Sequence, residues 1–410
     1  MLRSENTVVG LDVGTTKICA IIGEINEEGM VDVIGLGVSP SHGLRKGVVV
    51  NIDQTVAGIR KAVDDAELMA GCPADTVLAG ISGGHIKGFN SHGVIAIKNR
   101  EVTAVDVDRV IDAAEAVAMP MDREVIHTLP QEYIVDDQEG IREPIGMAGV
   151  RLEARVHIVT AAVSAAQNIV RCAHRSGLRV NDLVLQQMAS SEAALSADEK
   201  ELGVTLIDIG GGTTDVAVFS EGAIRHTAVI AVGGRQLTND IAVGLRTPMT
   251  EAEKIKKRYG CALASMVGAD ETIPVPGVGG RQPRVLARSV LADITEPRVE
   301  EILGLARREL EKFNLLDSVA SGVVLTGGTV AIEGMCELAE QIFDMPIRLG
   351  YPIGISGLVD VVNSPAYSTG VGLVLWGARK QNQDLAGPFT GDGMFEQVVG
   401  RMKQWFVDAF

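Results

Sequence analysis

The sequence predicts an α/β protein built from two related lobes, with a separate helix at its C-terminal end. A strand–turn–strand pattern rich in Gly and Thr occurs near the start of the chain and again near its middle. Each copy is followed by alternating strand and helix patterns, which are typical of α/β layers. Aromatic residues gather in positions 395–410, where an apolar stripe predicts the C-terminal helix. We therefore expect a duplicated, two-lobed architecture.

The two hairpins define the lobes. In the first, strands at residues 8–13 and 17–22 are joined by a Gly-Thr-Thr turn, and Asp12 lies at the end of the first strand. In the second, strands at residues 204–209 and 216–219 flank the sequence GGGTTD, and Asp208 holds the matching position. This equivalent placement of the aspartate and the Gly-Thr turn predicts that the lobes are copies of one unit.

Helical spacing of apolar residues predicts the helices that cover these strands. Residues 85–162 separate two parts of the first lobe and are interpreted as an inserted subdomain. Residues 380–393 are polar, contain Gly and Pro, lack periodicity and predict a flexible linker. The predicted helices span residues 50–70, 105–119 and 164–176 (ending at Gly177) in the first lobe, and 251–260 and 296–312 in the second.

The composition is that of a globular protein and disfavours several classes of function. Of 410 residues, 46% are apolar and 22% charged, and the net charge of −16 argues against nucleic-acid binding because no Lys/Arg-rich block offsets it. Five scattered cysteines without a CxxC pair predict reduced thiols, and the seven histidines lack metal-ligand spacing. No secretory signal and no spanning run of roughly 20 apolar residues are present. We expect a cytoplasmic protein.

Both turns carry the residue types that bind phosphate and magnesium. Glycines let backbone N–H groups approach anionic oxygens, hydroxyls add donors, and a carboxylate binds the hydrated metal. A simple β-turn explains one such motif, but two copies favour a clamp around one triphosphate, with Lys17 placed to meet its charge. Other nucleotide motifs fail: GxxxxGK[ST] does not occur, and Pro40 stands where a dinucleotide fingerprint beginning at Gly35 needs its third glycine.

The helix predicted at residues 394–410 has one continuous apolar face. Its acidic and basic residues balance, so insertion of the apolar face, rather than attraction to anionic lipid, would drive binding to a membrane surface. Docking of this face on the protein itself or on a partner is the alternative. The residues expected to enter the membrane are Phe395, Val398, Val399, Met402, Trp405, Phe406 and Phe410.

Several motifs resemble those of the superfamily that contains actin, DnaK-type chaperones and sugar kinases. VGLDVGTTK (9–17) is similar to its first phosphate motif and LIDIGGGTTD (206–215) to its second, while LTGGT (325–329) is similar to its adenosine motif. LQQMASSEAAL (185–195) and YSTGVGLVLWG (367–377) resemble the two helices that connect its lobes.

Within this superfamily, essentially the whole chain resembles the FtsA family of bacterial cell-division proteins. The stretches at residues 127–160, 260–284 and 294–303 carry this likeness, together with the insertion and the terminal helix. The resemblance implies an actin-like duplicated fold of four subdomains. The implied boundaries are 1–84 and 163–196 for subdomain 1A, 85–162 for 1C, 197–237 and 313–379 for 2A, 238–312 for 2B, 380–393 for the linker and 394–410 for the membrane-targeting helix.

The resemblance also implies a site for ATP and magnesium. Asp12 and Asp208 would bind magnesium largely through water, and Gln186 would orient a water for at most slow hydrolysis, although Gln187 stands where many relatives have Pro. For the residues on helix 251–260, a plain solvated face is the alternative. The implied ATP-binding residues are Asp12, Gly14, Thr15, Thr16, Lys17, Asp208, Gly210, Gly211, Gly212, Thr213, Thr214, Gly233, Gly234, Glu251, Lys254, Lys257, Gly327 and Gly328.

The function that the resemblance implies is that of a cell-division protein that polymerises and tethers FtsZ filaments to the cytoplasmic face of the inner membrane at the septum. Subdomain 2B would bind the FtsZ C-terminal tail, and subdomain 1C would contact later division proteins. A metabolite kinase and a pilus-assembly scaffold on the same fold are the alternatives, and the detached amphipathic helix favours division. The residues implied for FtsZ are Arg281, Arg284, Glu296, Arg298 and Glu301.

Overall fold

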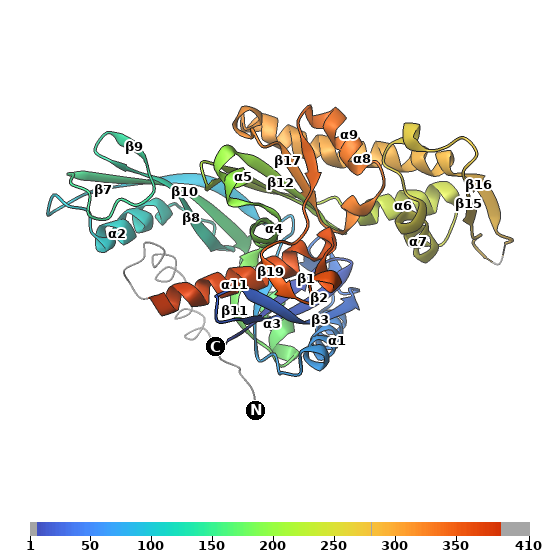
Figure 1. Ribbon diagram of the computed structural model, residues 1–410, viewed down its shortest axis with the longest axis horizontal. Coiled ribbons are helices and arrows are strands. Elements are labelled where there is room, and N and C mark those ends of the chain that lie inside the picture. Colours follow the sequence, from blue (N-terminus) through green and yellow to red (C-terminus); the bar gives the residue numbers. More distant parts are fainter. Residues whose placement is uncertain (1–5, 280, 387–410) are drawn as a thin grey trace.

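The structure is a computed structural model that describes residues 6–279 and 281–386. Two large sheets lie in two lobes, and a third sheet extends to one end of the molecule (Figure 1). The predicted membrane-targeting helix at residues 394–410 lies outside the described residues. Within the described part of the chain, no helix is long and apolar enough to cross a membrane.

The sheet of the first lobe has six strands in the order β11-β6-β1-β2-β3-β19. The predicted hairpin is confirmed, because β1 and β2 pair antiparallel with Asp12 opposite Cys19. On the other side of β1, strands β6 and β11 continue the sheet in parallel. The strands are β1 (Thr7–Val13), β2 (Lys17–Ile25), β3 (Val31–Pro40), β6 (Thr76–Ile81), β11 (Arg179–Leu185) and β19 (Ile355–Gly357).

Helices cover both faces of this sheet. On one face, α1 (Ile52–Ala70) approaches β3 so closely that a Cβ on Gly37 would lie 1.8 Å from the carbonyl oxygen of Ala62. Helix α3 (Val163–Arg175) packs beside α1 and ends before a left-handed glycine, as predicted. On the other face, α11 (Ser368–Ala386) crosses β1, and glycines again permit the close contact.

The sheet of the second lobe repeats this topology, which confirms the predicted duplication. Its order is β14-β13-β12-β17-β18, with β12, β13 and β14 antiparallel and β17 and β18 parallel to β12. Asp208 at the end of β12 lies opposite Asp215 of β13. The strands are β12 (Val204–Ile209), β13 (Thr214–Ser220), β14 (Ala223–Ile230), β17 (Val323–Thr326) and β18 (Ile347–Leu349).

Four helices and a small hairpin complete the second lobe. Helices α8 (Arg288–Lys312) and α9 (Met335–Phe343) pack together, and α8 also contacts the sheet. Helices α6 (Gly234–Leu245) and α7 (Met249–Tyr259) form one end of the molecule with the hairpin of β15 (Thr272–Val275) and β16 (Arg284–Ala287) (Figure 1). The shorter elements of the two lobes are α5 (Ala197–Leu202), α10 (Val359–Val362), β4 (Leu44–Arg45), β5 (Val48–Val49) and the 3₁₀ turns η1 (Ala264–Met266), η2 (Leu316–Ser318), η3 (Gly328–Ala331) and η4 (Pro365–Tyr367).

The inserted segment forms its own layer. Its sheet has the order β7-β10-β8-β9, and α2 covers one face to give a separate hydrophobic cluster. Helix α2 ends earlier than predicted because Val117 and Met121 are exposed, so no core extends the helix, and Pro120 restricts the residue before it. The elements are β7 (Lys87–Ala96), α2 (Ala104–Glu115), β8 (Arg123–Val135), β9 (Gln138–Ile141) and β10 (Arg151–Ala162).

Helix α8 begins at Arg288, earlier than the sequence predicted, and continues through Pro297. Proline removes one helical hydrogen bond, but side chains anchor the part of the helix that precedes it. Arg288 donates to the carboxylates of Glu271 (2.7 Å) and Glu333, and the Thr295 hydroxyl donates to a buried carbonyl oxygen. These contacts hold the first two turns in place, so the proline does not end the helix.

The predicted linker begins later than expected, because α11 continues to Ala386. The Lys380 ammonium pairs with the Asp182 carboxylate at 3.1 Å and ties this part of α11 to β11. No Gly or Pro occurs in the sequence between residue 380 and Gly387, so nothing in the local sequence ends the helix earlier. The first half of the predicted linker is therefore helical, and its remainder lies outside the described residues.

The two predicted connecting helices, α4 (Gln186–Ala194) and α11, cross at a very short distance. A Cβ on Gly372 would lie 1.7 Å from the backbone carbonyl oxygen of Ala189. Backbone cannot yield as a flexible side chain can, so this position requires glycine. The relative placement of the two helices therefore depends on that absence of a side chain.

We expect G372A to lower the free energy of unfolding by about 2 kcal/mol or more, because the new methyl group must push α4 and α11 apart. G304A is the matched control: Gly304 lies in α8, and a Cβ there meets only the end of a flexible arginine at 3.4 Å. That change should be neutral or stabilise by about 0.5–1 kcal/mol. Urea unfolding measures both, and equal stability of the two variants would contradict the packing argument.

Candidate nucleotide-binding cleft

The two Gly-Thr turns face each other between the lobes. A Cβ on Gly211 would lie 1.8 Å from the Oγ1 atom of Thr16, and a Cβ on Gly212 would lie 2.4 Å from the Oγ1 atom of Thr15. The second turn therefore needs glycines because the first turn lies against it. The backbone N–H of Gly47 donates to Thr15 Oγ1 at 3.0 Å and fixes that hydroxyl. The structure thus brings the two predicted phosphate-binding turns together.

Three buried carboxylates surround the turns. Burial raises the pKa of Asp12 to about 6, with Lys17 opposing the shift, and burial together with Asp208 raises the pKa of Asp215 to about 7. The pKa of Asp208 is also raised by burial, while hydrogen bonds from two hydroxyls act in the opposite direction. Concentrated negative charge of this kind is what a divalent cation would stabilise.

Both connecting helices donate to the carboxylate of Asp208. Its Oδ2 atom accepts from Ser190 of α4 at 2.6 Å and from Thr369 of α11 at 3.1 Å, and the two hydroxyls lie 3.0 Å apart. All three side chains are buried, so these bonds are shielded from water. Asp208 therefore connects the second-lobe strand to both helices that join the lobes.

Gln186, the first residue of α4, lies in the cleft. Its Nε2 atom donates to Asp12 Oδ1 at 3.0 Å, which places an amide beside the first-lobe carboxylate. Gln187 is turned instead toward the second lobe, where its Nε2 donates to the carbonyl oxygen of Ala228 at 3.3 Å. Helix α4 begins at this pair, so a glutamine at residue 187, where many relatives have proline, does not distort the start of the helix.

Gly234 and Gly327, two further predicted glycines, line the second-lobe side of the cleft. The N–H of Gly234 donates to the carbonyl oxygen of Gly210 at 2.9 Å. Gly327 has a φ of 94°, and a Cβ there would lie 2.3 Å from Asp208 Oδ1. Thr329, which belongs to the LTGGT motif but was not among the implied ATP-binding residues, adds a hydroxyl bond to the carbonyl oxygen of Gly210 at 2.9 Å. These segments form one hydrogen-bonded wall next to Asp208.

On helix α7, a lysine that was not predicted bonds to the segment that carries Gly234. Lys254 is exposed and pairs with Glu251 at 2.8 Å, and Lys257 is also exposed. Lys256 is buried, and its ammonium donates to the carbonyl oxygen of Gly234 at 3.1 Å and pairs with Glu253 at 2.7 Å. Burial lowers the pKa of Lys256, and Glu253 opposes that shift. The four-residue spacing from the buried Ala252 was the signal that identifies this inward position.

A serine that the sequence analysis did not identify links the lobes directly. Ser82, at the end of β6, donates to Asp215 Oδ1 at 2.5 Å, and Thr213 donates to the other oxygen at 3.1 Å. Ser82 and Asp215 are both buried. The DIGGGTTD motif contains this second aspartate, but only the fold shows that it faces the first lobe.

The residues implied for FtsZ divide into two groups. Arg281 and Arg284 are exposed on or beside the β15–β16 hairpin. On α8, Glu296 accepts from the backbone N–H of Ala264 at 2.6 Å, while Arg298 pairs with α6 and with Glu301. The helix residues therefore already make internal contacts, and so does Arg284, whose guanidinium donates to the carbonyl oxygen of Leu245.

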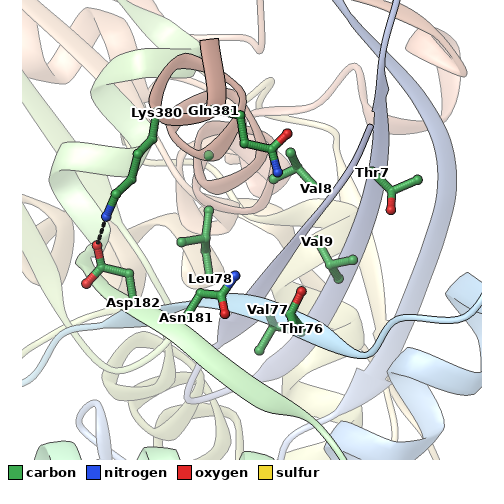
Figure 2. Close-up of a pocket in the computed structure, with 11 residues that line it drawn as sticks. Thr7, Val8, Val9, Thr76, Val77, Leu78, Asn181, Asp182, Lys380 and Gln381 are labelled. Atoms are coloured by element: carbon green, nitrogen blue, oxygen red, sulfur yellow. Dashed lines mark hydrogen bonds and ion pairs between the residues drawn. The ribbon is translucent and has the colours of Figure 1, made fainter. Parts of the chain in front are cut away.

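A cavity of about 110 Å³ lies at the far end of the first-lobe sheet (Figure 2). It is bounded by the starts of β1 and β6, by β11 and by the outer part of α11, with Thr7 and Val9 on one side and the Lys380–Asp182 pair on the other. Because Asp12 lies at the opposite end of β1, this cavity is separate from the cleft between the turns.

Ionisation of Asp215 should destabilise the nucleotide-free protein as pH rises. Its pKa is about 7 in the folded protein and 3.8 ordinarily, so between these values the folded state holds a proton that the unfolded chain has released. Stability therefore falls as pH rises through this window. From pH 5.5 to 7.5, the free energy of unfolding should fall by about 2 kcal/mol more in the unaltered protein than in D215N. Urea unfolding at both pH values tests this, and equal falls would contradict it.

Solved structures of other proteins share this fold. The chain aligns with a PilM–PilN type IV pilus biogenesis complex at a TM-score of 0.66 and 17% identity, covering 90% of this chain and 98% of that one. It aligns with MreB5 of Spiroplasma citri bound to ADP at a TM-score of 0.55 and 15% identity, covering 94% of this chain and all of the other. At these identities the likeness shows the actin-like fold alone.

Sequence relatives are far more similar. The chain is 53% identical to the cell division protein FtsA of Pseudomonas aeruginosa, covering all of this chain and 99% of the relative. It is 46% identical to that of Neisseria meningitidis over the full length of both, and 45% identical to that of Escherichia coli K12 over 90% of each. The family model "Cell division protein FtsA" matches residues 205–372, and "SHS2 domain inserted in FTSA" matches residues 83–160. The chain belongs to the FtsA family of cell division proteins.

Proposed function

We propose that the protein binds ATP and magnesium between its lobes, polymerises, and tethers FtsZ filaments to the inner membrane at the division septum. The observation that carries this proposal is the convergence of the two Gly-Thr turns beside the buried Asp12 and Asp208. Membership of the FtsA family supports the role in division. The MreB5 structures with ADP and AMPPNP support nucleotide as the ligand of this fold.

The residues of the cleft fit a magnesium–triphosphate ligand. In the described part of the chain, no three His, Cys, Asp or Glu side chains converge to hold a metal directly. Magnesium would therefore be bound through water and phosphate oxygens, with Asp12 and Asp208 accepting from its water shell. The backbone N–H groups of both turns and Lys17 would meet the phosphates. Gly233, Gly327 and Gly328 would flank the sugar, and α7 the base.

Hydrolysis in this cleft would be slow. Gln186 can orient a water molecule by hydrogen bonding, but a neutral amide cannot accept its proton. The same amide donates to Asp12, so it is shared between the carboxylate and any attacking water. We infer that ATP acts mainly as a ligand that selects the closed, polymerising conformation.

The two outer parts of the chain supply the tether. We propose that the exposed arginines of the β15–β16 hairpin, Arg281 and Arg284, bind the C-terminal tail of FtsZ, together with Glu301 on α8. The apolar side chains of residues 394–410 would insert into the membrane surface. One such helix binds reversibly, and a polymer that presents many helices would bind with avidity. Later division proteins would contact the inserted subdomain.

The magnesium–ATP site predicts that D208N raises the Kd for a fluorescent ATP analogue about tenfold or more in magnesium, because a neutral amide no longer attracts the hydrated cation. The loss should be smaller when EDTA replaces magnesium. D344N is the matched control, since Asp344 is exposed at the end of α9 with a left-handed φ of 56° that asparagine also adopts. Unchanged affinity of D208N in magnesium would exclude Asp208 from the site.

The tether predicts that full-length protein carries purified FtsZ into the pellet with liposomes, whereas a version that ends at Gly393 leaves FtsZ in solution. W405A with F406A should weaken pelleting strongly, because it removes two large apolar side chains from the inserting face. Q397A, on the polar side of the same helix, is the control and should pellet normally. If the truncated version pelleted FtsZ, another segment would bind the membrane. If FtsZ stayed in solution with both the full-length and the truncated protein, the tether would be excluded.

A further inference from the structure

Lys17, the predicted phosphate-binding lysine, is held by the turn that precedes α11. Its ammonium donates to the carbonyl oxygen of Ala366 and lies 4.0 Å from the centroid of the Tyr367 ring. Both partners belong to η4. A residue from the first-lobe hairpin is thus bound by a segment that lies almost at the other end of the described chain.

Both partners of Lys17 are electrically neutral. Within residues 6–279 and 281–386, no carboxylate lies within ion-pair distance of its ammonium, although Asp12 and Asp208 are near enough for Lys17 to lower the pKa of each. An aromatic face attracts a cation without neutralising it. An ammonium also has three N–H donors, so a carbonyl oxygen and a ring leave donor capacity for phosphate.

The second lobe fixes the position of η4. The carbonyl oxygen of Pro365 accepts from the N–H of Gly327 at 3.1 Å and from the Thr326 hydroxyl at 3.3 Å. Ser368, next to Tyr367, bonds the same Thr326 hydroxyl at 2.7 Å. The residues on either side of Tyr367 are therefore anchored to the end of β17 and to the glycine segment beside Asp208. None of these anchoring bonds involves Lys17.

We propose that Tyr367 is a positioning residue for ATP binding, which holds the Lys17 ammonium where the phosphates of the nucleotide meet it. The proposal rests on the ATP function proposed above. A lysine side chain has many rotamers, and an ammonium already held near its binding position loses less freedom when the ligand arrives. Because the ring is neutral, it does not compete with phosphate for the charge.

The test is a titration of the full-length protein with a fluorescent ATP analogue in magnesium. Y367L removes the aromatic face but keeps an apolar side chain, and its Kd should rise about three- to tenfold. Y367F keeps the ring face and should restore most of the affinity. Y351L is the matched control, because Tyr351 is an exposed tyrosine of the second lobe. Urea unfolding of each variant establishes that it is folded.

A double-mutant cycle separates positioning from a general structural effect. K17M should weaken binding by itself, and adding Y367L to K17M should cause little further loss, since the ring acts through the lysine. The proposal would be overturned if Y367L reduced the affinity by the same factor whether Lys17 is present or replaced by Met. Tighter binding by Y367L would also overturn it, because the ring would then compete with phosphate. If the unaltered protein does not bind the analogue, the proposed ATP function fails. If it binds and Y367L binds equally well, only the role of Tyr367 fails.

Discussion

The buried carboxylate of Asp208 is the constraint on which the arrangement of the lobes depends. A buried carboxylate needs hydrogen-bond donors in place of water. For Asp208 the donors come from both connecting helices: Ser190 on α4 and Thr369 on α11. Gly327 passes so close to the same carboxylate that no side chain fits there. A ligand that changes the charge around Asp208 therefore acts on both helices and on the second-lobe wall at once.

Because α4 and α11 are closely packed, a change at Asp208 would move the two helices together. Gly372 of α11 lies against the backbone of Ala189 in α4, so neither helix can shift freely past the other. Helix α11 then runs without a break from Thr369 beside Asp208 to Lys380, which pairs with Asp182 on β11. One continuous helix thus connects the cleft to the end of the first-lobe sheet.

Motifs that occur twice in the sequence were predicted correctly, whereas contacts that form only in the folded protein were missed. The two hairpins were predictable because duplication leaves the same pattern twice, and the sheets repeat one strand order. Both connecting helices were predicted from their resemblance to those of the actin superfamily. Ser82 was not predicted, since its partner Asp215 lies 133 residues away in sequence. Lys256 was also missed, although it lies four residues after Ala252 on the buried face of α7. The start of the linker was misplaced because the sequence from residue 380 is polar. The segment contains no helix breaker, however, and the ion pair of Lys380 with Asp182 holds it as a continuation of α11. The ligand roles, the FtsZ surface and the membrane helix stay predictions.

The inserted sheet adds a restraint of its own to any opening of the lobes. Although it interrupts the first lobe in sequence, it bonds to β14 of the second: the Gln131 Nε2 atom donates to the carbonyl oxygen of Ile224 at 2.8 Å, and His157 Nε2 lies 2.8 Å from the Thr227 hydroxyl. Burial lowers the pKa of His157 to about 3, so its ring stays neutral there. Lobes that separate must therefore either break these bonds or move the inserted sheet with the second lobe. In both cases the position of the inserted sheet changes relative to one of the two lobes.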